Sequence, residues 1–222
     1  MTSPEEDFWI GSARRQATLA GPARDLHRAV LRRFLDSGAA PALNWVRQAA
    51  AEFGLGDSGL AELEAADLVH LDGEVVAVAY PFSGPPTRQQ VELDSFPAVY
   101  AMCAIDALGI PAMAGRDGRI VAADPRDSAP VVVSVKGAGE AGGGTWTWTP
   151  ASAVVVFAHA MDCGTDCESW EAMCPNTTFH ASRESAQAYL AARGDIDGHI
   201  LNQQAAVECG RRNFGSLLGG PV

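Results

Sequence analysis

Residues 100–113 read YAMCAIDALGIPAM, an apolar stretch in which a cysteine and an aspartate stand three positions apart. If the stretch forms a helix, Cys103 and Asp106 share one of its faces, so the thiol and the carboxylate can approach each other. Burying such a pair costs free energy, which makes the two residues candidates for chemistry. The structural alternative is a small core cysteine beside a polar residue on the helix surface.

The composition indicates an ordinary globular chain with a real core. It has 222 residues, of which 47% are hydrophobic and 19% charged, enough for one large or two small domains. The net charge of −11, with 16 Lys and Arg spread along the chain, argues against a nucleic-acid or anionic membrane surface. No apolar run is long enough to span a membrane, and the acidic start is unlike a secretory signal, so we expect a soluble cytoplasmic protein.

The first part of the chain has the pattern of helices followed by a hairpin. Apolar residues at helical spacing from Leu26 to Phe53, interrupted by DSGAAP at 36–41, predict two helices, and GLAELEAADL at 59–68 predicts a third. The stretch VHLDGEVVAVAY at 69–80 then predicts a hairpin with a tight turn at its Asp-Gly pair. Three helices and a hairpin predict a winged-helix-like domain.

We place this winged-helix-like domain at residues 25–83, after an N-terminal extension at 1–24 and before a Gly- and Pro-rich linker at 84–93. A winged helix that reads DNA needs a basic recognition helix. The second predicted helix offers only Arg47 against Glu52, and the third is acidic. The domain is therefore expected to be a packing module that binds no nucleic acid.

The remaining residues, 94–222, alternate between short β-type runs and helical patterns. The β-type runs are RIVAA at 119–123, APVVVSV at 129–135, GTWTWTP at 144–150 and SAVVVFAHA at 152–160. They predict one mostly antiparallel sheet. Helices are expected at SAQAYLAARG, 185–194, and around HILNQQAAVECG, 199–210. The predicted fold class is α+β, with a catalytic domain of an antiparallel sheet flanked by helices.

Five cysteines, an odd number, favour free thiols over a disulfide framework. Three of them crowd into residues 159–182, HAMDCGTDCESWEAMCPNTTFHAS, with histidine and methionine nearby. This soft ligand set suits Cu(I), Zn(II) or Hg(II), although a Cys-x3-Cys pair in a loop is often without a role. The candidate metal ligands in this segment include Cys163, Cys167, Cys174 and His159. Cys209 is expected to be a small structural residue.

Two segments together resemble the organomercurial (alkylmercury) lyase family. They are YAMCAIDALGIPAMAGRDGRIVAADPRDSAPVVVSV at 100–135 and CPNTTFHAS at 174–182. The catalytic helix of that family carries Cys-x-x-Asp, and its second catalytic cysteine lies shortly before an Ala-Ser pair. The resemblance extends over about residues 25 to 200, and it implies an N-terminal winged-helix-like domain without a DNA-binding role.

The resemblance implies that Cys103 and Cys174 are the catalytic cysteines and Asp106 the catalytic aspartate. Two thiolates are preferred ligands of soft Hg(II), and a carboxylate beside them can accept a thiol proton and deliver it to carbon. The implied reaction converts an organomercurial into a hydrocarbon and bound Hg(II) without a required cofactor. Small thiols or a mercuric reductase are the implied acceptors of Hg(II).

The chain departs from the family pattern at several positions. Asp124 stands where members have a further structural cysteine, and His180 stands where an aromatic residue is usual. The segment with Cys163 and Cys167 is unlike typical members, and its thiols are candidates for an Hg(II) exit relay. These departures keep an alternative open, namely a diverged thiol-based protein that binds copper, zinc or mercury, or a biosynthetic enzyme on the same scaffold.

Overall fold

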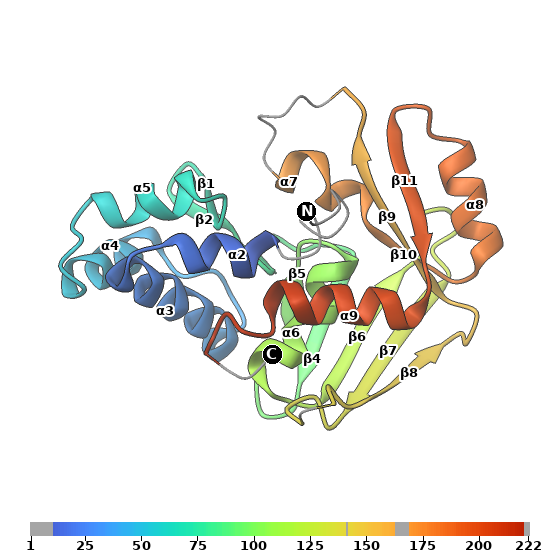
Figure 1. Cartoon of the computed structure of the whole chain (residues 1–222), viewed down its shortest axis with the longest axis horizontal. Helices are drawn as coiled ribbons and strands as arrows, with labels where there is room; N and C mark the ends of the chain where they lie inside the picture. Colours follow the sequence, from blue (N-terminus) through green and yellow to red (C-terminus); the bar gives the residue numbers. More distant parts are fainter. Residues whose placement is uncertain (1–10, 141, 163–168, 220–222) are drawn as a thin grey trace, which may run out of the picture.

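The computed structural model describes residues 11–140, 142–162 and 169–219. The chain is an α+β protein in which N-terminal helices precede a large antiparallel sheet with further helices (Figure 1). The N-terminal helices are α2 (Gly11–Thr18), α3 (Gly21–Ser37), α4 (Leu43–Glu52) and α5 (Ser58–Ala65). Within the described ranges, no helix has both the length and the hydrophobicity needed to cross a bilayer.

The large sheet has eight antiparallel strands in the order β1-β2-β3-β5-β4-β6-β7-β8. The strands are β1 (Val69–Asp72), β2 (Val75–Ala79), β3 (Phe82–Ser83), β4 (Gln89–Leu93), β5 (Val99–Ala101), β6 (Gly118–Ala123), β7 (Pro130–Lys136) and β8 (Thr145–Thr149). Burial alternates along β4 and β7, so each of these strands buries one face.

A second, three-stranded sheet has the order β10-β9-β11. Its strands are β9 (Val154–Ala160), β10 (Thr178–His180) and β11 (Ile196–Leu201). The remaining elements are α6 (Ala104–Ala114), α7 (Ser169–Ala172), the 3-10 turn η1 (Cys174–Asn176), α8 (Arg183–Ala191) and α9 (Gln203–Phe214).

The predicted N-terminal helices and hairpin are present in the predicted order. Helix α3 ends at Ser37 because Gly38 adopts a left-handed C-cap conformation (φ 70°), as the DSGAAP break predicts. The hairpin turn falls on Gly73 and Glu74, since Asp72 pairs with Val75. The extension expected at 1–24 contains α2, and residues 89–93 of the expected linker form β4. The division into domains stays a prediction.

Two predictions for the C-terminal half were wrong. The run at 152–160 does not join the large sheet, because β9 pairs with β10 and β11 instead. The start of the segment at 199–210 is not helical, because residues up to Leu201 form β11 against β9. Helix α9 begins at Gln203, where the side chain of Asn202 accepts the Ala205 N–H as an N-cap.

Helix α6 lies in the core, between the large sheet and α9 (Figure 1). Its residues are buried on almost every side, which explains why its sequence shows no polar face. The two helices cross closely at a pair of glycines. A Cβ on Gly109 would lie 2.4 Å from Cδ2 of Phe214 and 2.7 Å from the carbonyl oxygen of Gly210.

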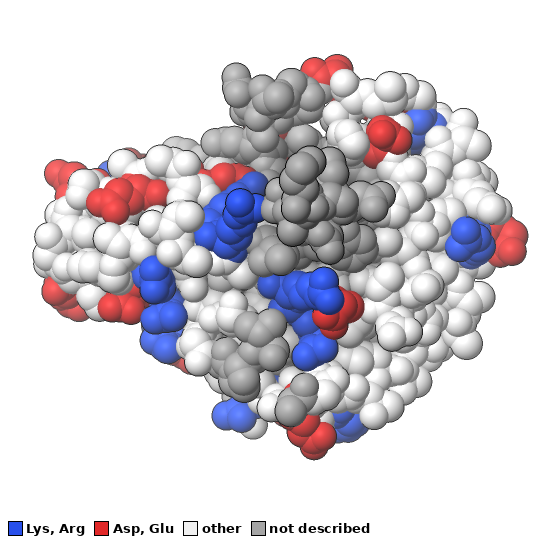
Figure 2. Space-filling model, in the orientation of Figure 1, with Lys and Arg blue, Asp and Glu red and all other residues white. Residues whose placement is uncertain are grey.

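The surface agrees with the acidic composition. Acidic side chains are scattered over the end of the molecule that carries α4 and α5 (Figure 2). On the same face, Lys and Arg side chains form small separate groups.

The close crossing of α6 and α9 predicts a strong penalty for a larger residue. Gly109→Ala should lower the free energy of unfolding by about 1–3 kcal/mol, because the methyl group overpacks the crossing. In the matched control Gly21→Ala, the methyl group meets no atom within 4 Å, and alanine favours the α3 helix, so stability should hold or rise. Urea unfolding of the two variants measures the difference. If Gly109→Ala is as stable as the wild type, the close packing of α6 against α9 is contradicted.

Candidate active site

Cys103 and Asp106 lie at the N-terminal end of α6. The helix begins at Ala104, so Cys103 is its N-cap, with extended backbone (φ −144°, ψ −177°), and Asp106 stands in the first turn. The Cys103 sulfur and a carboxylate oxygen of Asp106 lie within 4.8 Å of each other. The predicted approach of the two side chains is present, through an N-cap arrangement instead of a shared face within the helix.

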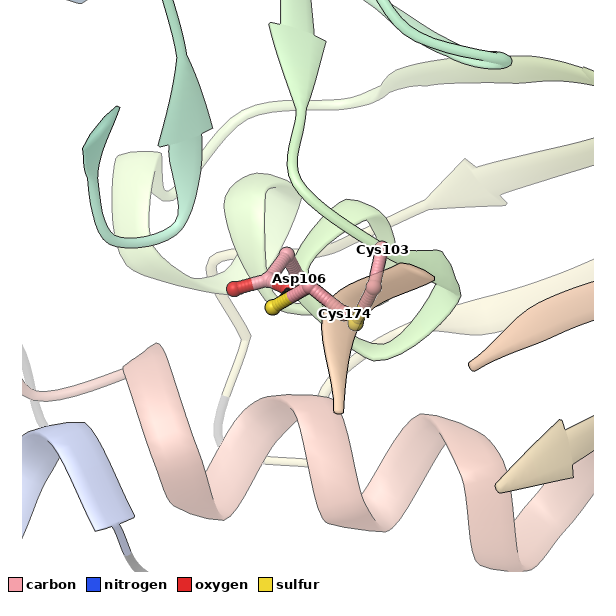
Figure 3. A group of neighbouring side chains, drawn as sticks. All are labelled: Cys103, Asp106 and Cys174. Carbon is pink, nitrogen blue, oxygen red and sulfur yellow. Dashed lines mark hydrogen bonds between the residues drawn. The ribbon is translucent and has the colours of Figure 1, made fainter. Parts of the chain in front are cut away.

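Cys174 reaches the same point from a distant part of the chain. It opens η1, between α7 and β10, and its Sγ donates to Oδ2 of Asp106 at 3.8 Å. The backbone N–H of Ala104 donates to the carbonyl of Thr177 at 3.2 Å, which ties the start of α6 to this segment. The ligand atoms of Cys103, Asp106 and Cys174 all lie within 4.8 Å of one another, and all three residues are buried (Figure 3).

Burial controls the protonation of this cluster. It raises the pKa of Asp106 from 3.8 to about 7, although hydrogen bonds from Cys103 and Cys174 oppose the rise. Burial likewise raises the pKa of Cys103, and the neighbouring Cys174 and Asp106 add to the rise. A hydrogen bond from Cys103 favours the Cys174 thiolate, but burial and the Asp106 charge outweigh it and raise the pKa of Cys174. The carboxyl group therefore exchanges its proton most readily near neutral pH.

The cluster opens into a cavity of about 260 Å³. The lining residues come from helix α2, from Tyr80 after β2, and from α6, β9, α9 and the segment from α7 to Thr177. The apolar lining residues are Ile105, Phe157, Met173 and Phe214. The polar lining residues away from the cluster are Ser12, Arg14, Arg15, Tyr80, Ser169, Thr177 and Asn213. The cavity therefore places an apolar wall beside two thiols and a carboxyl group.

A polar network at the rim of the cavity connects α2 to the rest of the protein. Arg15 forms an ion pair with Asp67 and donates to Oγ of Ser169 at 3.1 Å, and Ser169 donates to Asp67 at 2.8 Å. Oδ1 of Asp67 lies 2.7 Å from Nε2 of His70. Sequence reasoning missed this network, because its members are far apart in the chain and α2 was not predicted as a helix.

Among the other predicted metal ligands, the described residue His159 does not join the cluster. His159 lies on β9, opposite Asp197 of β11, and its side chain is exposed. Cys163 and Cys167 lie outside the described residues. Cys209 is buried in α9, where burial raises its pKa to about 12 and Nδ2 of Asn213 lies 3.5 Å from its sulfur. The described candidate site therefore contains the three residues Cys103, Asp106 and Cys174.

The buried side chains of Asp124 and His180 are in contact. Nδ1 of His180 lies 3.3 Å from Oδ1 of Asp124, and the backbone N–H of Ala181 donates to Oδ2 of Asp124 at 2.9 Å. Nε2 of His180 lies 3.0 Å from Oγ1 of Thr178. Burial lowers the pKa of His180 despite the Asp124 charge, so near neutral pH the contact joins a neutral imidazole and a carboxylate. The pair joins the end of β6 to β10.

Comparisons with known proteins give the family and the fold of the chain. A family model described as MerB, alkylmercury lyase, matches residues 82–215. Among solved structures, the crystal structure of the mercury-bound form of MerB2 is similar with a TM-score of 0.72. That similarity covers 98% of this chain and 100% of the other at 17% sequence identity, so it shows a shared fold. No curated protein sequence matches the chain.

The raised pKa of Asp106 predicts how stability depends on pH. Between pH about 4 and about 7 the folded protein holds a proton that the unfolded chain releases, so this group lowers stability as the pH rises through that window. Asp106→Asn removes the ionisation. The free energy of unfolding of the variant should equal that of the wild type near pH 4. Above pH 7 it should be higher by on the order of a few kcal/mol.

Urea unfolding at a series of pH values measures this difference. The control Asp36→Asn replaces an exposed carboxylate on α3 and should change stability little at any pH. A stability difference between Asp106→Asn and wild type that is the same at every pH would contradict the buried, proton-holding carboxyl group.

Proposed function

Because the chain belongs to the alkylmercury lyase family, we propose that it cleaves carbon–mercury bonds in organomercurials and releases a hydrocarbon and Hg(II). The observation that carries the proposal is the buried cluster of two thiols and one carboxyl group within 4.8 Å. Two soft ligands and one proton carrier are the groups that this reaction needs. No resident cofactor enters the proposal, since the metal belongs to the substrate.

The two cysteines act as ligands of the mercury in the substrate. Each sulfur loses its proton as it forms a bond to mercury, and the ligand that accompanied the organomercurial leaves. Two thiolates increase the electron density on the metal and weaken its bond to carbon. When that bond breaks, its electron pair goes to carbon, which takes up one of the two thiol protons. The second proton leaves with the displaced ligand or passes to solvent, and no group is oxidised or reduced.

Asp106 carries the proton from sulfur to carbon. Its Oδ2 lies 3.8 Å from the Cys174 sulfur, and the pKa of about 7 lets it accept a proton and return it near neutral pH. An aspartate at its usual pKa near 3.8 holds a proton too weakly for this task. Burial at the start of α6 thus produces the chemical property that the reaction requires.

The organic group of the substrate is proposed to rest on the apolar wall of the cavity. Ile105 and Phe157 lie on this wall with Met173 and Phe214, and the cavity of about 260 Å³ suits a small alkyl or aryl group. Small thiols or a mercuric reductase are the proposed acceptors of the Hg(II) product. A protein that binds soft metal ions with the same thiols, without turnover, is the alternative that the assay below separates.

We infer that residues 25–83 form a winged-helix-like unit that supports the site. Helices α3, α4 and α5 followed by the hairpin β1–β2 have the element order of a winged helix. The exposed acidic residues of this unit give no support to DNA binding. Its proposed role is to position Asp67, His70 and Tyr80 beside the catalytic residues of the second part, 94–222.

The first test of the proposal is turnover by the wild type and by cysteine variants. Wild-type protein with phenylmercury and excess small thiol should release benzene over many turnovers, which gas chromatography of the headspace measures. Cys103→Ser and Cys174→Ser should each lower the rate by about a thousandfold or more, because each removes a mercury ligand. Cys209→Ala removes a thiol outside the cluster and should keep the activity. Mercury bound by the wild type without benzene would establish the alternative.

The second test is the pH dependence of turnover. Asp106 must be ionised to accept a thiol proton, so kcat/KM should rise as the pH increases through about 7 and then level off. Below a pH of about 7, kcat/KM should fall about tenfold for each pH unit. Initial rates in a series of buffers of constant ionic strength measure the profile. A flat profile across this range would exclude Asp106 as the proton acceptor.

A further inference from the structure

The hydroxyl group of Tyr80 is buried beside the catalytic cluster without a partner. Tyr80 is 2% exposed, and among the described residues its oxygen atom has no hydrogen-bond partner. The same cavity is lined by Tyr80, Cys103, Asp106 and Cys174. A buried hydroxyl that makes no hydrogen bond destabilises a protein, so its presence calls for an explanation.

The ring of Tyr80 is fixed by the structure around it. The residue lies between β2 and β3, and its backbone N–H donates to the carbonyl of Leu68 at 3.1 Å. Its ring meets His70 edge-on, with centroids 5.8 Å apart and planes at 81°. Nε2 of His70 in turn lies 2.7 Å from Oδ1 of Asp67. These contacts hold the ring of a residue that lines the cavity.

The surroundings keep the Tyr80 hydroxyl protonated. Burial raises its pKa far above the usual value, and negative charge on Cys174, Asp67 and Asp106 acts in the same direction, while Arg15 opposes it weakly. A neutral phenol can donate one hydrogen bond. Among these neighbours, Cys174 lines the same cavity as Tyr80, and a hydrogen bond donated by the Tyr80 hydroxyl would lower the pKa of Cys174.

We propose that Tyr80 is a positioning residue whose hydroxyl donates a hydrogen bond to the Cys174 sulfur when that sulfur gives its proton to Asp106. This inference rests on the proposed function. In the step, the S–H bond of Cys174 breaks, the proton goes to Oδ2 of Asp106, and the O–H bond of Tyr80 stays intact. The hydroxyl has no partner before the step and gains one as charge develops, so it stabilises the reacting state more than the resting state.

Tyr80→Phe tests the proposal, because it keeps the ring and removes only the oxygen. The kcat for benzene release should fall about 10- to 100-fold, the contribution expected of a hydrogen bond to a charged group. The KM should change little, and thermal stability should hold or rise, because an unpaired buried hydroxyl is lost. A kcat equal to that of the wild type would overturn the proposal, and so would a loss of activity that follows a loss of stability.

Tyr189→Phe is the matched control. Its hydroxyl accepts a hydrogen bond from Nη1 of Arg193 at 3.1 Å, on α8 and outside the cavity lining. The substitution should leave kcat unchanged and lower stability slightly. An equal fall of kcat in both tyrosine variants would mean that the effect of Tyr80→Phe is general, and it would overturn the specific role.

A second measurement does not depend on carbon–mercury cleavage. If the wild type releases no benzene, the proposed function fails, and Tyr80 can still be examined through the reactivity of Cys174. Two proteins are compared, Cys103→Ser and Cys103→Ser with Tyr80→Phe. Iodoacetamide should alkylate Cys174 about threefold more slowly in the second, because a smaller fraction of Cys174 is thiolate. The higher nucleophilicity of that thiolate compensates in part. Peptide mass spectrometry assigns the label to Cys174. Equal alkylation rates would overturn the role of Tyr80 whatever the reaction is.

Discussion

The proposed chemistry depends on one buried carboxyl group at the start of one helix. Asp106 lies in the first turn of α6, where the backbone N–H groups and the helix dipole favour its charge. Burial opposes that charge more strongly, and the balance places its pKa at about 7. The surrounding elements maintain the balance. The large sheet and α9 enclose α6 from opposite sides, and η1 brings Cys174 against the carboxyl group.

The sequence was sufficient for the features that depend on local spacing. The Cys-x-x-Asp stretch, the helix break at Gly38 and the hairpin after α5 are encoded within a few residues each, so the prediction of each was sound in outline. The family resemblance supplied Cys174, which no local rule connects to Cys103. It could not supply Tyr80 or Arg15, because neither residue belongs to a motif and each reaches the cavity only through the tertiary fold.

The errors have a common physical origin in the pairing of strands. The run that forms β9 is apolar except for His159, and such a run does not indicate which sheet will contain it. Its partners, β10 and β11, are short and lie beyond the 163–168 segment, so nothing near β9 reveals the second sheet. Strand β11 carries exposed polar residues and directly precedes α9, and the helical pattern of α9 was extended backwards over it.

The contact between Asp124 and His180 bears on how this chain diverged from its relatives. In this chain the buried side chains of Asp124 and His180 lie 3.3 Å apart. A substitution that removes one of the two leaves the other buried polar side chain with fewer partners, which is costly. The two positions should therefore covary among relatives. A relative with aspartate at position 124 is expected to have a hydrogen-bonding residue at position 180. Sequence changes at these two positions therefore have to be compared together.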